Sequence, residues 1–70
     1  MIINGYYLEF VGDKKSQAVK GEQAEEIRAA LDKLNVLRAR MYFEALGYKF
    51  RILSVEKHGS YKHVSFMKVK

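Results

Sequence analysis

Two histidines on either side of a glycine-containing turn are the residues best suited to chemistry in this sequence. His58 and His63 are separated by four residues, and Glu56 lies just before them. Imidazole nitrogens and carboxylate oxygens are common metal ligands, but a site needs three or four of them. Glu56 would be a third ligand only if a hairpin brought it to the histidines. The spacing does not require this, so we assign no metal ion and no cofactor.

Other catalytic patterns are missing from the sequence. Ser60 or Ser65 could form a nucleophile constellation with His63 and a distant aspartate, but the spacing gives no support for one. The sequence has no glycine-rich phosphate loop, and it has no paired carboxylates at a spacing typical of acid–base catalysis. We therefore predict that the protein is not an enzyme and has no small-molecule substrate.

The composition indicates a small intracellular domain. The chain has 70 residues and no cysteine, which predicts a single domain over residues 1–70 without disulfides or a thiolate zinc site. Small secreted domains usually depend on disulfides. No apolar run reaches the roughly eighteen residues that a membrane helix needs. We expect a cytoplasmic protein without a membrane partner.

Hydrophobic periodicity predicts an α+β fold. Residues 2–11 alternate as in a strand, and residues 22–46 carry apolar side chains at the three- and four-residue spacing of a helix. Two further strands, at 48–57 and 61–70, follow as a hairpin. The expected domain is β-α-β-β, with a three-stranded, mostly antiparallel sheet and one long helix packed on one face. The helix is unusually long for so small a domain, so Asn35 is a candidate position for a kink or a split into two helices.

The strand predicted at 48–57 has apolar residues on both of its faces. Phe50 and Ile52 alternate on one face, whereas Leu53 and Val55 would lie on the other. Either both faces are partly covered, or a β-bulge shifts the register.

The predicted helix also carries a second apolar ridge. Val36, Ala39 and Phe43 lie opposite its main apolar stripe. On a continuous helix this ridge indicates a partner surface, most simply a homodimer interface. If the helix breaks near Asn35, the same residues face the core instead.

Positive charge is concentrated in the last third of the chain. The net charge is +5, and residues 47–70 carry six basic residues against Glu56 alone. Aromatic residues alternate with these cations. Nucleic-acid-binding proteins use this combination, in which the cations contact phosphates and the rings stack on bases. The alternative is a solvated face whose lysines prevent association of sheet edges. The predicted binding residues are Lys49, Arg51, Lys62, Lys68, Lys70, Tyr48, Tyr61 and His63.

The strand order is similar to that of the RelE/ParE toxin superfamily. The residues that carry the resemblance are Tyr6-Tyr7-Leu8-Glu9-Phe10, which match a first strand of the Tyr-x-Leu-x-Phe type, and the basic segment 48–70. The chain is shorter than is usual in that family, and no family catalytic residue can be assigned to a position here. The resemblance implies an RNA-directed, toxin-like activity as a remote alternative.

The leading hypothesis is a non-enzymatic protein whose basic C-terminal hairpin binds an anionic macromolecule, with nucleic acid as the first candidate. The alternative is a protein-interaction module or inhibitor, of the kind that phages and mobile elements use, which binds an acidic protein surface and forms a homodimer.

Overall fold

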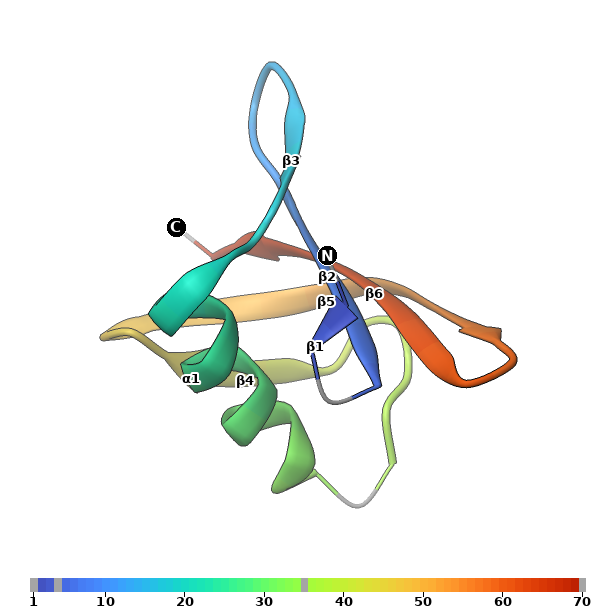
Figure 1. Ribbon diagram of the computed structural model, residues 1–70. Coiled ribbons are helices and arrows are strands. Elements are labelled where there is room, and N and C mark those ends of the chain that lie inside the picture. The colour runs from blue at the N-terminus through green and yellow to red at the C-terminus, as the bar shows by residue number, and fades with distance from the viewer. Residues whose placement is uncertain (1, 4, 35, 70) are drawn as a thin grey trace.

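The computed structural model describes residues 2–3, 5–34 and 36–69 as one helix and a set of strands (Figure 1). In chain order, the elements are β1 (Ile2–Ile3), β2 (Tyr6–Val11), β3 (Ser16–Ala18), α1 (Gly21–Asp32), β4 (Tyr42–Ala45), β5 (Tyr48–His58) and β6 (Tyr61–Lys68). The helix therefore separates the first three strands from the last three.

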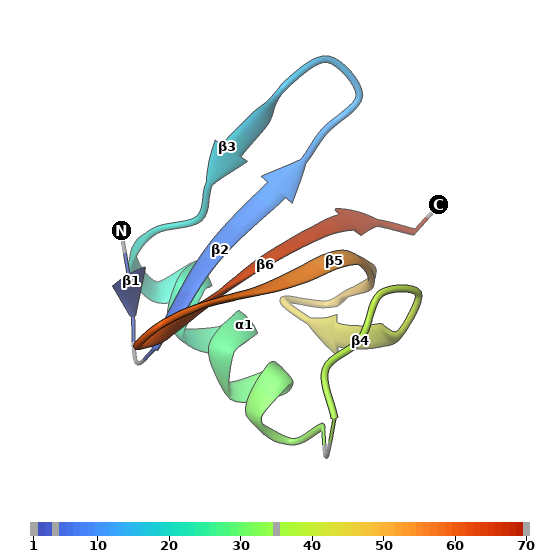
Figure 2. The same cartoon turned by 90° about the vertical axis from the view of Figure 1, so that its right-hand side faces the viewer.

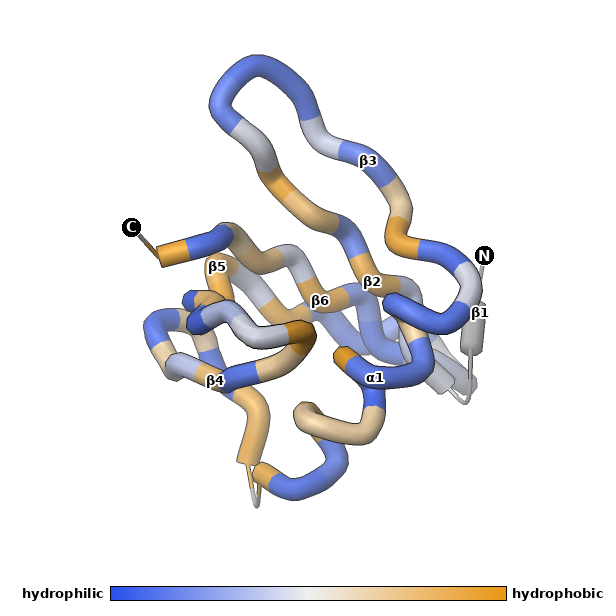
Figure 3. The backbone as a smooth tube through the Cα atoms, turned by 90° about the vertical axis from the view of Figure 1, so that its left-hand side faces the viewer, coloured by the Kyte–Doolittle hydropathy of each residue, from blue (hydrophilic) through white to orange (hydrophobic). Residues whose placement is uncertain are grey.

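The strands form one mixed sheet. Their order is β1-β2-β6-β5-β4, and β3 also pairs with β2. β2 and β6 run parallel, whereas the other paired strands are antiparallel. β1 pairs with the first residues of β2 and β3 with the last, so these two short strands share the edge of β2 that faces away from β6. The β2–β3 hairpin projects from the rest of the molecule, and its turn is hydrophilic (Figures 2 and 3).

One face of the sheet packs against α1 (Figure 2). Ala24, Ile27 and Leu31 are buried, and their spacing of three and four residues places them on one side of the helix. The buried side chains of the sheet are Tyr6, Leu8, Phe43, Phe50, Ile52, Val64 and Phe66. Within the described part of the chain, no second layer covers the opposite face of the sheet.

A β-bulge explains the apolar residues on both sides of the second predicted strand. The register of β5 against β6 shifts between Ile52 and Ser54. Ile52 then pairs with Phe66, and Val55 pairs with Val64. Because Val64 and Phe66 both lie in the core, the bulge brings Val55 to the same face of the sheet as Ile52.

The prediction of one long helix over a three-stranded antiparallel sheet is wrong. α1 ends at Asp32, and the predicted helical segment also contains strand β4, which pairs with β5 through Phe43 and Phe50. Leu46 and Gly47 have φ values of 58° and 78° and close the β4–β5 hairpin. The left-handed conformation is available to glycine at no steric cost. Asn35, where a break was expected, lies outside the described residues.

The apolar ridge predicted for a homodimer interface is not a helical surface. Val36 and Ala39 lie in the connection between α1 and β4 and are exposed. Phe43 is only 5% exposed, and its ring stacks on that of Phe50 at a centroid distance of 5.2 Å. The three residues therefore do not form one outward-facing patch.

No helix in the described residues has the length and apolar character needed to cross a membrane. The helix α1 has only twelve residues, and its polar side faces solvent.

A hydrogen bond from the sheet holds the last turn of α1. The Tyr6 hydroxyl donates to Oδ1 of Asp32 at 3.0 Å. Burial raises the pKa of Tyr6, and the hydrogen bond and negative charge of Asp32 raise it further. The protonated phenol is thus the form that the folded state favours.

Substitution of Phe43 tests its place in the core. We expect Phe43→Ala to lower the free energy of unfolding by about 3–5 kcal/mol, because it leaves a cavity beside the rings of Phe50 and Phe66 in the core. Val36→Ala, at a residue that is 50% exposed, should change it by less than about 0.5 kcal/mol. Urea denaturation followed by circular dichroism measures both values, and equal effects would contradict the assignment of Phe43 to the core.

Tyr6→Phe tests the link between β2 and α1. Because the folded state raises the pKa of Tyr6, its contribution to the free energy of unfolding is complete below about pH 10 and is lost as pH rises through the folded pKa. Below pH 10 the variant should lose about 1 kcal/mol. Above pH 10 the wild-type protein should lose stability more steeply than the variant. Urea titrations between about pH 8 and 11 measure this, and parallel pH profiles would contradict it.

Candidate functional site

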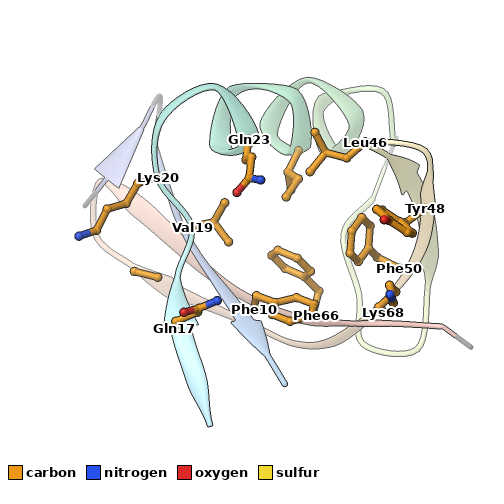
Figure 4. A pocket seen from close by; sticks show the side chains of 12 residues that line it. Phe10, Gln17, Val19, Lys20, Gln23, Leu46, Tyr48, Phe50, Phe66 and Lys68 are labelled. Carbon is orange, nitrogen blue, oxygen red and sulfur yellow. The ribbon is translucent and has the colours of Figure 1, made fainter. Parts of the chain in front are cut away.

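A groove lies where α1 leaves part of the sheet uncovered. It has a volume of about 710 Å³ and is walled by α1, the segment from β3 to α1, and the β4–β5 turn (Figure 4). Phe10, Phe50 and Phe66 form an aromatic floor, in which the rings of Phe50 and Phe66 meet edge to face at 5.4 Å. The lining residues are Phe10, Gln17, Ala18, Val19, Lys20, Gln23, Ile27, Leu46, Tyr48, Phe50, Phe66 and Lys68.

The charge of this groove is positive. Lys20 and Lys68 are its charged lining residues, and the described residues that line it include no carboxylate. Gln17 and Gln23 add amide groups that both donate and accept hydrogen bonds. The aromatic floor can stack on a flat ring, and the lysines and amides around it can bind the anionic and polar groups of the same ligand.

Two exposed tyrosines lie on opposite faces of the β4–β5 hairpin. Tyr42 is 49% exposed and Tyr48 is 53% exposed. The Lys49 ammonium lies over the Tyr42 ring at 5.1 Å from its centroid, and that of Lys68 lies over the Tyr48 ring at 4.6 Å. These cation–π contacts keep a positive charge beside each accessible ring.

Further cations lie along the same edge of the sheet. The backbone N–H of Arg40 donates to the carbonyl of Ile52 at 2.7 Å, so the chain already runs beside β5 before β4 begins. Arg51 pairs across the strands with Tyr42. Glu44, opposite Lys49, is the carboxylate of β4. We name this region the basic edge and define it as Arg38, Arg40, Tyr42, Tyr48, Lys49, Arg51 and Lys68.

The cations of the basic edge are not committed to ion pairs. Among the described residues, the ion pairs given by the structure involve Arg28 on α1 and the two histidines. Nε of Arg51 is buried without a hydrogen-bond partner in the described structure. Arg38, Arg40, Lys49 and Lys68 are exposed, so their positive groups can reach an anionic ligand.

The predicted binding residues divide between the two ends of the β5–β6 hairpin. Tyr48, Lys49, Arg51 and Lys68 lie together in the basic edge. Lys62, Tyr61 and His63 lie near the opposite end, where they pair with β5 residues from Glu56 to His58. Tyr48 and Glu56 are eight positions apart on β5, or about 27 Å at about 3.4 Å per residue. Lys70 lies outside the described residues.

Sequence reasoning missed Arg38, Arg40 and Tyr42 because it placed them on a helix. The signal that could have identified a strand was the pair of β-favouring aromatic residues at 42–43, followed by Leu46-Gly47 and another aromatic run. That pattern is typical of a hairpin.

The opposite end of the sheet holds the described residues that could bind a metal ion. Glu56, His58 and His63 each offer one ligand atom, and these atoms lie within 4.8 Å of one another. They lie on the face of the sheet turned away from α1.

Comparison with known proteins gives no match to any family model, curated protein or solved structure. The RelE/ParE resemblance therefore stays a prediction that rests on the residue pattern at 6–10 and 48–70, since the strand order of the structure differs from the one predicted.

Proposed function

We propose that the chain is a non-enzymatic protein that binds single-stranded nucleic acid on its basic edge and in the adjoining groove. The observation that best supports this is the exposure of Tyr42 and Tyr48, each with a lysine ammonium over its ring. Proteins that bind single strands combine such rings with a positively charged surface. A cytoplasmic location is part of the same proposal.

Phosphate contacts account for the charge of the basic edge. The basic edge contains five cationic side chains, and Glu44 is the carboxylate of the adjoining strand β4. Lys49 and Lys68 lie beside rings, so one lysine–tyrosine pair can contact a phosphate and a neighbouring base together. The affinity should then depend strongly on salt, since each phosphate contact releases counterions.

The groove favours an unpaired base over a duplex. Bases within a duplex are stacked on each other and cannot reach Tyr48 or the Phe10 side of the groove. The volume of about 710 Å³ lies within the range of about 300–1,000 Å³ typical of small-ligand pockets. Gln17 and Gln23 can pair with the polar edge of a base that enters.

A fluorescence anisotropy titration tests this function. The probes are labelled single-stranded RNA and DNA of about 15 nucleotides and a duplex of the same sequence, each at low and moderate salt. We expect the single strands to bind more tightly and to lose affinity with salt. Tyr48→Ala should weaken binding roughly 5- to 150-fold, because stacking of one base contributes about 1–3 kcal/mol. Lys68→Ala should weaken binding and reduce the salt slope by about one.

Lys57→Ala is the matched control. Lys57 is an exposed lysine of β5 outside the basic edge, and its loss removes the same charge as Lys68→Ala. It should leave affinity nearly unchanged. Equal losses for the two lysine variants, tighter binding of the duplex, or no binding at low salt would each contradict the proposal. Binding of polyglutamate without binding of nucleic acid would instead support the acidic-protein alternative.

A further inference from the structure

We propose that Glu56, His58 and His63 bind one divalent transition-metal ion, with zinc as the first candidate. Nδ1 of His63 lies 3.7 Å from Oε1 of Glu56, and Nε2 of His58 lies 3.9 Å from the same oxygen. Ligand atoms around a tetrahedral zinc ion are about 3.3 Å apart, given metal–nitrogen distances of about 2.0–2.1 Å. Small movements of Glu56 and His58, which are both exposed, would complete this geometry.

The strand register brings the three ligands together. Glu56 and His63 are direct cross-strand partners on β5 and β6. His58 follows Glu56 by two residues on β5, so both side chains point to the same face of the sheet. The three ligands therefore belong to one hairpin. The turn between β5 and β6 brings His58 and His63 together although four residues separate them in the sequence.

Glu9 orients His63 from the neighbouring strand. Its Oε1 lies 2.8 Å from Nε2 of His63. With a proton on Nε2, His63 donates a hydrogen bond to Glu9, and Nδ1, on the Glu56 side of the ring, is then the nitrogen left to bind the metal. Metal-bound histidines commonly have such a carboxylate on their other nitrogen, because it selects the tautomer and increases ligand basicity. Glu9 is thus a positioning residue.

Two tyrosines hold the histidine rings in place. The Tyr7 ring stacks on His63 at 4.7 Å, and the Tyr61 ring stacks on His58 at 5.2 Å. Stacking limits rotation of each imidazole. The metal would therefore meet ligands that are already ordered, which lowers the entropic cost of binding.

The ligand types select the metal. Imidazole nitrogen suits zinc, nickel and copper, whereas magnesium prefers oxygen ligands and retains its water. Three protein ligands on an exposed face leave further coordination positions to water. This site does not depend on the proposed nucleic-acid function, because it lies at the other end of β5.

Calorimetric titration of the untagged, chelator-treated chain tests the proposal, with zinc chloride as ligand and magnesium chloride as the comparison. We expect one zinc ion per chain and no comparable binding of magnesium. Glu56→Gln and His58→Ala change exposed residues, and each should weaken zinc binding more than about tenfold. Glu9→Gln should weaken it about 10- to 100-fold, with an unchanged thermal melting curve. Glu44→Gln removes an exposed carboxylate of β4 and should have no effect.

Histidine side-chain ¹H–¹⁵N spectra identify the coordinating atoms. Zinc should shift Nδ1 of His63 and Nε2 of His58, while Nε2 of His63 keeps its proton. The proposal is overturned by the absence of saturable zinc binding, or by full zinc affinity in both Glu56→Gln and His58→Ala. A His63 ring that carries protons on both nitrogens, with signals that zinc does not shift, would also overturn it. That result would identify His63 as an imidazolium paired with the carboxylates of Glu9 and Glu56.

Discussion

Parallel pairing of β2 with β6 is the constraint on which both faces of the sheet depend. Its register places Leu8 beside Val64 on the helix side, where both are buried. Because successive side chains alternate between faces, the same register pairs Tyr7 with His63 and Glu9 with Ser65 on the other side, and there the Glu9 carboxylate reaches His63. A slip of one residue would expose the core and separate this pair. The core and the histidine cluster are therefore two results of one alignment.

The helix covers only one face of the sheet, and part of that face remains open. The groove adjoins Tyr48 at one end of β5, and Glu56 with His58 lies at the other end. Since β5 has eleven residues and pairs with β4 and β6, it holds the two regions at a nearly constant distance. Stability comes from the covered middle of the sheet, whereas the polar and aromatic groups suited to binding gather at its ends.

Local patterns predicted strands at β2, β5 and β6, because alternation and the turn at residues 58–60 depend on neighbouring residues alone. They did not predict β4 or the parallel pairing. The apolar spacing around Phe43 also fits a helix, and only its contact with Phe50 across the hairpin distinguishes the two. For the same reason Tyr48 and Lys68 were found as candidate binding residues, whereas Tyr42 was missed. Glu9 was missed because 54 positions separate it from His63.

The position of β6 has a consequence for biosynthesis. It lies between β2 and β5, yet it follows every other described strand in the chain. A ribosome therefore releases both neighbours of the central strand before the strand itself, and their apolar faces and unpaired edges stay exposed meanwhile. Closing such a long loop is slow. Until β6 emerges, these surfaces are open to association with other chains, and a premature stop within β6 would remove a central strand of the sheet.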